Sequence, residues 1–237
     1  MLQGHEHPLS KITREVNAIF SELGFVFAEG PEMESVAYNF DMLNFPPEHP
    51  ARDMQDTFFI EGKESMVMRT HTSPVQVRFM EKHEPPIRAI VPGKVFRNEA
   101  TDATHEAQFF QLEGLMVDRD VSLAHLKGTL EYFFARFFGG NVEVRFRPSF
   151  FPFVEPGIEV DMRLTGDSAP LKLKDKWIEI MGAGMIHPNV LRNAGIDPAV
   201  YQGFAFGMGM DRLAVMKYEI DDIRMLYSGD LRVVNQF

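Results

Sequence analysis

Two guanidinium groups stand at places in the sequence where a phosphorylated ligand could be bound. The first, Arg97, lies in the segment Phe96–Glu99, and Glu99 follows two residues later on the same side of a predicted strand. A planar guanidinium on a rigid strand can bind a phosphate through parallel hydrogen bonds. The loop that follows carries His105, and the next predicted strand carries Phe109, whose ring could stack on a base. The pattern favours a nucleotide site, although an exposed Arg–Glu pair beside an ordinary hairpin would use the same residues.

The second guanidinium, Arg212, follows a glycine-rich segment that includes Gly203, Gly207 and Gly209. Close glycines at a strand-to-helix junction let a ligand approach the backbone, and Arg212 would project from the first turn of that helix. The spacing superficially resembles a dinucleotide fingerprint, but Arg212 stands where its third glycine belongs and no βαβ repeat surrounds it. A Rossmann fold is therefore excluded. Close packing of a strand against a helix, beside a surface arginine, is the alternative reading.

Composition limits the class of protein. The chain has 237 residues, of which 45% are apolar and 24% charged, and this fits one globular domain over 1–237. Cysteine is absent, so disulfides and thiolate metal sites are excluded, and any metal would be a hard cation such as Mg2+. The formal charge of −10 disfavours a clamp on duplex nucleic acid and leaves room for a local basic pocket. We find neither a membrane span nor a signal peptide, and therefore expect a cytoplasmic protein.

The elements expected to position these residues form an α+β domain. Apolar residues at helical spacing predict helices over 5–23 and 122–138. Strands are expected over 25–27, 57–61, 66–70, 87–91, 94–98, 108–117, 142–146, 157–164, 177–181 and 203–208. Turns separate most of these strands, so we expect a largely antiparallel sheet flanked by helices.

Three further helices are expected from local signals. One follows the turn at 29–31 and places Met33 on its buried side, together with Val36, Ala37 and Phe40. Another begins with Ser73 as its N-cap and ends near Met80. The final helix begins near Gly209. An exposed edge strand with alternating lysines is expected at Lys172, Lys174 and Lys176.

Three segments, taken in order, resemble the signature motifs of the class II aminoacyl-tRNA synthetases. These are 24–32, which would lie at a dimer interface, the hairpin that begins at 96, and the glycine-rich strand that ends in Arg212. Longer segments are similar to the catalytic domain of the bacterial-type phenylalanyl-tRNA synthetase alpha-subunit family, from about His7 to Phe237: THTSPVQ, FRNEATDATHEAQFFQLEG, PSFFPFVEPG, GAGMIHPNVLRNAGID and GFAFGMGMDRLA. The resemblance implies a class II synthetase-like sheet and an ATP-dependent ligase. Such an enzyme activates L-phenylalanine and transfers it to tRNA(Phe).

The resemblance also implies a role for each matched position. Arg97 would bind the α-phosphate and the amino-acid carboxylate, Glu99 and His105 the rest of ATP, and Phe109 and Arg212 the two faces of adenine. Arg97, His105 and Arg212 would thus be the catalytic residues, with Gly207 and Gly209 beside the nucleotide. The residues implied to bind the α-ammonium of phenylalanine are His71, Ser73, Gln111 and Glu113. Phe151 and Phe153 would sandwich its ring edge-to-face, with Ala205 at the far end.

The implied metal and partners complete the expectation. Glu155 matches an Mg2+ ligand, and Glu179 is the candidate for a second carboxylate. A beta subunit would complete a heterotetramer of two alpha and two beta chains. The family's N-terminal helical arm, which reaches tRNA, has no counterpart, so we expect a trimmed or naturally short form. Gln55 stands where some relatives carry Trp and receives no role.

Two functions remain open at this point. One is an active ligase subunit, catalytic once paired with its beta partner, and the other is a non-catalytic binding or accessory module with the same fold. The intact charged set around Arg97 and Arg212 favours the ligase. The histidines His5 and His7 could form a metal pair, but an unstructured N-terminus is the simpler interpretation.

Overall fold

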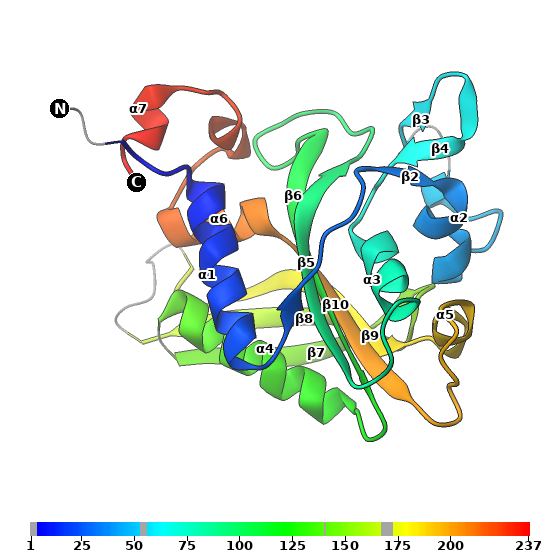
Figure 1. Cartoon of the computed structure of the whole chain (residues 1–237). Coiled ribbons are helices and arrows are strands. Elements are labelled where there is room, and N and C mark those ends of the chain that lie inside the picture. Colours follow the sequence, from blue (N-terminus) through cyan, green and yellow to red (C-terminus); the bar gives the residue numbers. More distant parts are fainter. Residues whose placement is uncertain (1–3, 53–55, 140, 167–172) are drawn as a thin grey trace.

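A seven-stranded sheet forms the centre of the molecule (Figure 1). The structure is a computed structural model that describes residues 4–52, 56–139, 141–166 and 173–237. The strand order is β1-β5-β6-β10-β9-β8-β7. Every neighbouring pair is antiparallel except β1 with β5, which is parallel. The predicted α+β class is confirmed.

Most strands of this sheet run further than the sequence pattern indicates, whereas β1 is shorter and β5 ends two residues before its predicted end. Their bounds are β1 (Val26–Phe27), β5 (Ile87–Phe96), β6 (Gln108–Asp118), β7 (Asn141–Phe151), β8 (Val154–Thr165), β9 (Trp177–Ile186) and β10 (Gln202–Gly209). The strands predicted over 87–91 and 94–98 are one strand, β5. Pro92 and Gly93 read as a break, yet they pair in register with Leu112 and Gln111 of β6.

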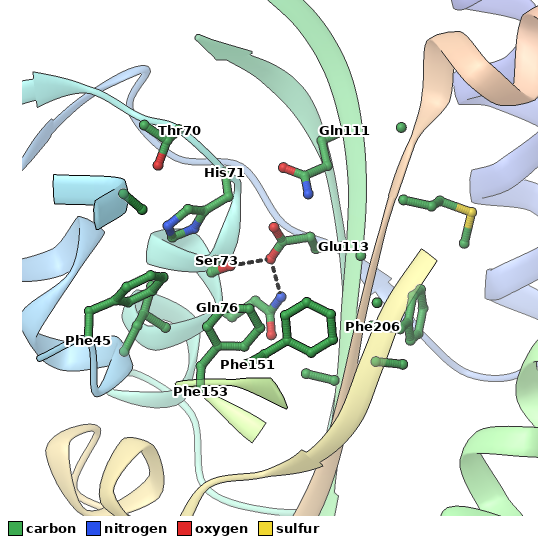
Figure 2. Close-up of a pocket in the computed structure, with 18 of the residues that line it drawn as sticks. Phe45, Thr70, His71, Ser73, Gln76, Gln111, Glu113, Phe151, Phe153 and Phe206 are labelled. Atoms are coloured by element: carbon green, nitrogen blue, oxygen red, sulfur yellow. Dashed lines mark hydrogen bonds between the residues drawn. The ribbon is translucent and has the colours of Figure 1, made fainter. Parts of the chain in front are cut away.

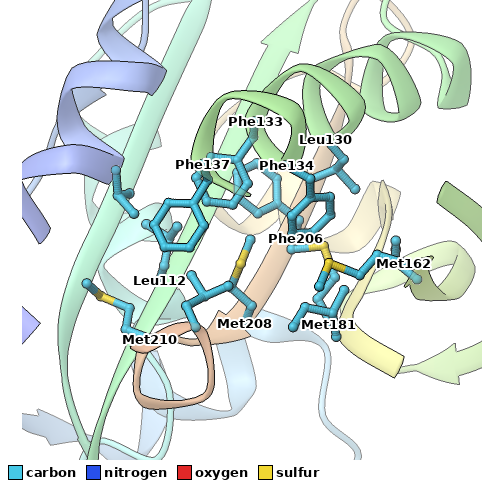
Figure 3. Packing of buried hydrophobic residues seen from close by; sticks show 14 of the residues in the cluster. Leu112, Leu130, Phe133, Phe134, Phe137, Met162, Met181, Phe206, Met208 and Met210 are labelled. Atoms are coloured by element: carbon cyan, nitrogen blue, oxygen red, sulfur yellow. The ribbon is translucent and has the colours of Figure 1, made fainter. Parts of the chain in front are cut away.

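One face of the sheet is covered by α1 (Pro8–Glu22) and α4 (Leu123–Phe138), with α6 (Met210–Tyr218) against α1 (Figure 1). Figure 3 shows aromatic rings of α4 over methionines of the sheet, among them Met181 and Met208. Phe20 of α1 is fully buried, and its ring centroid lies 4.9 Å from Phe133 and 5.4 Å from Phe206 of β10. Phe133, Phe134 and Phe137 of α4 are likewise buried in this core.

The N-terminal helix begins at Pro8, later than predicted. The reason is His7, whose Nδ1 accepts the Leu9 N–H at 3.2 Å and caps the helix. The other ring nitrogen of His7 lies 2.9 Å from the carbonyl oxygen of Leu226. His7 is therefore ordered. In the described ranges, no three His, Cys, Asp or Glu side chains are grouped for a metal.

The opposite face of the large sheet carries a second layer. A three-stranded sheet of order β2-β4-β3 is built from β2 (Met33–Ser35), β3 (Phe59–Ile60) and β4 (Lys63–Met68). With it lie the helical segments α2 (Val36–Asn39), η1 (Asp41–Leu43), η2 (Pro50–Arg52), α3 (Ser73–Met80) and α5 (Pro188–Asn193). A second apolar cluster joins this layer to the large sheet, and it includes Phe40, Val77 and Leu115.

Three local predictions are wrong in this layer and beyond. Met33 is an exposed strand residue, because Ser35 caps a shorter helix by accepting the Tyr38 N–H. Ser73 is the first residue of α3 and not its cap, which is Thr72. The helix α6 is not the last, since η3 (Ile223–Leu226) and α7 (Leu231–Val234) follow it.

The predicted lysine edge strand is also not found. Lys174 forms a single bridge with Leu164, and the next strand begins at Trp177. Lys172 and Gln55 lie outside the described residues. None of the helices in the described part of the chain has the length and apolar character needed to cross a membrane.

Candidate active site

A cavity of about 550 Å³ lies between the small sheet with α3 and the face of the large sheet (Figure 2). Its walls come from the start of α3, the strands β6, β9 and β10, the turn between β7 and β8, and residues within 40–56. The segment that follows β5 adds Arg97 and Glu99. Polar groups gather near α3 and β5, and aromatic rings gather near the β7–β8 turn. The cavity can therefore hold a ligand with a charged part and an apolar part.

Glu113 of β6 is the central polar group of the cavity, and 4% of it is exposed. Its carboxylate accepts hydrogen bonds from Ser73 Oγ and Gln76 Nε2, each at 2.6 Å, and from the Thr72 N–H at 3.2 Å (Figure 2). Burial raises the pKa of Glu113 to about 7, although these donors act in the opposite direction. A cation entering the cavity would stabilise the ionised carboxylate.

Several buried polar atoms beside Glu113 have no hydrogen-bond partner in the described residues. They are both ring nitrogens of His71, Oε1 of Gln111 and Oγ1 of Thr72. Burial, with the nearby charge of Arg97, lowers the pKa of His71 to about 3, so the imidazole is neutral at physiological pH. Because buried polar atoms are normally paired, these groups indicate a polar ligand at this end of the cavity.

The apolar end of the cavity is walled by aromatic rings. The centroids of Phe151 and Phe153 lie 5.9 Å apart, and Phe45 lies 5.7 Å from Phe153. Ala205 of β10 lines the same cavity. On β9, a Cβ at Gly182 would lie 2.8 Å from Cζ of Phe151, so the glycine leaves space for that ring. The arrangement suits an aromatic side chain.

Arg97 directly follows the end of β5, and its N–H donates to the Ala107 carbonyl at 2.9 Å. Its Nε donates to the Thr70 carbonyl at 3.1 Å, and its guanidinium carbon lies 5.0 Å from the centroid of the Phe109 ring. Burial lowers the pKa of Arg97 from a very high ordinary value, and the group stays protonated. Arg97, Glu99 and Phe109 all line the cavity. Three residues of the expected nucleotide set are thus brought together.

Two other residues of that set, Arg212 and His105, lie outside the lining. Arg212 is exposed on the first turn of α6, and its Cβ lies 3.8 Å from where a Cβ at Gly209 would stand. Gly207 and Gly209 themselves line the cavity. His105 is exposed, with Nδ1 at 3.0 Å from Oδ1 of Asp102. Arg212 therefore lies at the edge of the cavity and His105 beyond it.

The two carboxylates expected to share Mg2+ are not brought together. Glu179 accepts a hydrogen bond from Arg147 at 2.9 Å and pairs across from Asp161 of β8. Glu155 lies six residues away along β8, which corresponds to about 20 Å of strand. It lines a second cavity of about 470 Å³, with Phe150 and His187. The pair therefore does not fit a common Mg2+ site. The sequence could not show this, because spacing along the chain gives no information on strand register.

Known proteins resemble this chain over its whole length. The family model described as "tRNA synthetases class II core domain (F)" matches residues 1–237. A phenylalanine–tRNA ligase alpha subunit from Alkaliphilus metalliredigens is 56% identical over 237 residues, which cover 99% of this chain and 69% of the relative. One from Chlorobium phaeovibrioides is 54% identical over 240 residues, with 99% and 70% covered. The chain belongs to the phenylalanine–tRNA ligase alpha-subunit family of class II synthetases.

Sequence reasoning missed several residues of this synthetase cavity. Gln76 could have been found, since it lies three residues after Ser73 on one face of a helix. Phe45 and Gly182 carry no local signal, because their places depend on the packing of distant segments. The buried carboxylate of Asp211, next to Arg212, was also missed.

Proposed function

We propose that this chain uses its cavity to activate L-phenylalanine with ATP and to pass the acyl group to tRNA(Phe). The observation that carries the assignment is the buried carboxylate of Glu113, which faces an aromatic pocket across one cavity. A carboxylate and an aromatic pocket match the ammonium group and the ring of phenylalanine. Among the amino acids, this pair of features favours an apolar aromatic one.

We assign the amino-acid end of the cavity as follows. The α-ammonium binds Glu113, with Gln111, Ser73 and neutral His71 as its other hydrogen-bond partners. The ring lies between Phe151 and Phe153 and points toward Ala205. The carboxylate is thereby directed toward Arg97, which lies beside His71. This orientation supports the reaction, because the carboxylate is the attacking group.

Activation is an in-line displacement at the α-phosphorus of ATP. A carboxylate oxygen of phenylalanine forms a bond to phosphorus, and the bond to the bridging oxygen of pyrophosphate breaks. Because the nucleophile is already ionised, no general base is needed. Two anions must meet, and Arg97 supplies fixed positive charge where they do. We assign adenine to Phe109 and Arg212, and the rest of ATP to Glu99 and His105.

The second half-reaction transfers the acyl group from the adenylate to a hydroxyl of the terminal ribose of tRNA(Phe). Mg2+ is expected for the family, but Glu155 and Glu179 do not share a site, and we route no step through it. We propose a beta subunit as partner, in a heterotetramer of two alpha and two beta chains, and a cytoplasmic location. Exposed apolar side chains at Val26, Phe27 and Met33 support an interface near the first motif.

The proposal is tested by ATP–pyrophosphate exchange with the chain alone and with a beta subunit. We expect exchange with phenylalanine and little with tyrosine, and a loss of at least a hundredfold in Glu113→Gln. Tyr38→Phe is a suitable control, since the Tyr38 hydroxyl contacts Glu81 away from the cavity. Exchange that survives in Glu113→Gln would contradict the assignment. Absence of ATP and phenylalanine binding in calorimetry would instead favour a non-catalytic module.

A further inference from the structure

Asp211 is a buried carboxylate that the proposed reaction does not use. It lies on the first turn of α6, directly before Arg212, and 1% of it is exposed. Its Oδ2 accepts the Phe110 N–H at 2.6 Å, and its Oδ1 accepts a short hydrogen bond from the Tyr227 hydroxyl. Burial raises the pKa of Asp211 to about 6. Burying a carboxylate costs free energy unless hydrogen bonds compensate it, so we ask which segments its two donors connect.

The bond from Phe110 to Asp211 joins the two segments assigned to adenine. Phe110 follows Phe109 on β6, and Asp211 precedes Arg212 on α6. The ladder between β6 and β10 ends at the pair of Gln111 with Gly209. The Phe110 N–H is the next group along β6, at the point where β10 turns into α6. The ladder offers this N–H no acceptor on β10, because β10 has ended there. The Asp211 carboxylate accepts the hydrogen bond instead and so links β6 to α6.

The Tyr227 hydroxyl brings in a third segment, which we call the C-terminal strap and define as residues 222–227. The strap contains η3, whose first residue Ile223 donates its N–H to the Ala103 carbonyl at 3.0 Å. Ala103 lies in the loop that carries His105. The strap thus contacts the loop at one end and α6 at the other. Nε2 of His7 lies 2.9 Å from the carbonyl oxygen of Leu226, a residue of the strap, and so ties the strap to the start of α1.

We propose that Asp211 and Tyr227 are positioning residues for the nucleotide, which fix Phe109 and Arg212 on either side of the adenine and brace the loop that carries His105. The inference rests on the proposed function and adds the C-terminal strap to it. Neither residue touches the ligand. The Glu113 cluster lies on α3 and β6, away from the strap, so loss of the Tyr227 bond affects ATP and leaves phenylalanine binding unchanged.

The test is calorimetric titration of the full chain with MgATP and, separately, with phenylalanine. The variants are Tyr227→Phe, Asp211→Asn and the pair combined. Each single variant is expected to raise the Kd of ATP about tenfold and to change the Kd of phenylalanine less than twofold. The combined variant is expected to show less than the product of the two effects, because both act through one contact. Tyr38→Phe removes a hydroxyl–carboxylate bond at an exposed place away from the cavity and serves as the control.

The outcomes separate the two proposals. A selective loss of ATP affinity in Tyr227→Phe, absent from Tyr38→Phe, supports the positioning role. An unchanged Kd of ATP in Tyr227→Phe overturns it, and so does an equal loss of both ligands, which indicates a purely structural role. If one variant fails to fold, the other gives the same comparison. An unmodified chain that binds neither ligand overturns the proposed function itself, before any variant is considered.

Discussion

At the scale of single residues, the pKa of Glu113 sets a pH dependence for amino-acid binding. Burial raises this pKa to about 7, so part of the free protein carries a neutral carboxyl group at pH 7. The ammonium of phenylalanine binds the ionised form, and binding therefore releases a proton. Below pH 7 the ionised fraction falls with each unit, and the Kd of phenylalanine is expected to rise about five- to tenfold per unit.

Calorimetry from pH 5.5 to 8 measures this dependence, and a change of buffer reports the proton released. The variant Glu113→Gln cannot ionise, so its weaker binding is expected to be flat over the same range. A Kd that stays constant between pH 7 and pH 6 in the unmodified chain would show that Glu113 is ionised throughout. His71 cannot produce the effect, because its pKa of about 3 lies below the range.

Ala205 determines how much space remains at the tip of the substrate ring in the proposed pose. Replacement of Ala205 by Gly removes one methyl group from the wall of the cavity. We expect the kcat/KM for 4-chlorophenylalanine, relative to phenylalanine, to rise at least tenfold in pyrophosphate exchange. No improvement for the chlorinated substrate would place the ring elsewhere.

The residues of the site differ in how far the sequence could predict them. Arg97 and Glu99 directly follow β5, Phe109 lies on its partner β6, and the sequence spacing predicted that the three lie together. The prediction that Glu113 and Ser73 share one site rested on the family resemblance and not on their spacing. The expectation that Glu155 and Glu179 lie at one metal site does not fit the structure. Their separation depends on strand register and on a bulge between β8 and β9, and neither can be predicted from composition or spacing.

At the scale of elements, strand and helix types were largely predictable and their ends were not. Pro92 and Gly93 are normally signals for a break, but β6 pairs with β5 continuously from Ile87 to Phe96 and holds both residues in register. Ser73 is a good cap by its chemistry, yet its hydroxyl donates to Glu113 in the cavity. In both places a tertiary contact overrides a local preference.

Two glycine-to-alanine changes distinguish a site glycine from an ordinary one. In Gly182→Ala the new Cβ would lie 2.8 Å from the Phe151 ring and push it toward the cavity. We expect the Kd of phenylalanine to rise about tenfold. Gly128 lies exposed in α4 with nothing within 4 Å of its added Cβ. Gly128→Ala is expected to leave binding unchanged and to stabilise the fold by about 0.5–1 kcal/mol.

Calorimetry gives the two affinities, and urea unfolding gives the two stabilities. Equal affinity in Gly182→Ala and the unmodified chain would mean that the Phe151 ring does not contact the ligand. A loss of stability in Gly128→Ala would contradict its placement on the open face of the helix.

At the scale of the whole molecule, Phe20 joins the helical layer to the sheet. Its ring contacts Phe25, Phe133 and Phe206, and it is fully buried. Phe20→Ala is expected to lower the free energy of unfolding by about 3–5 kcal/mol. Denaturant unfolding should remain a single transition with an unchanged slope, because the two apolar clusters share the strands of one sheet.

Phe150→Ala is the matched control, since 75% of Phe150 is exposed, and its effect on stability is expected to be small. Two separate transitions in the unmodified chain would contradict a single domain over 1–237. Apolar spacing predicted the long helices α1 and α4. In the small second sheet, the strands predicted over 57–61 and 66–70 overlap β3 and β4, whereas β2 was predicted as part of a helix. The three residues of β2 are too few for a periodic pattern.

The alternation of side chains along β10 has a practical consequence for protein engineering. Phe204, Phe206 and Met208 pack in the core, and Ala205, Gly207 and Gly209 line the cavity, which Phe206 and Met208 also border. One eight-residue strand thus carries both side chains that keep the enzyme folded and positions that contact its substrate in the proposed pose. A randomised library confined to Ala205 and Gly207 would search for new amino-acid preferences while the three core side chains are left intact.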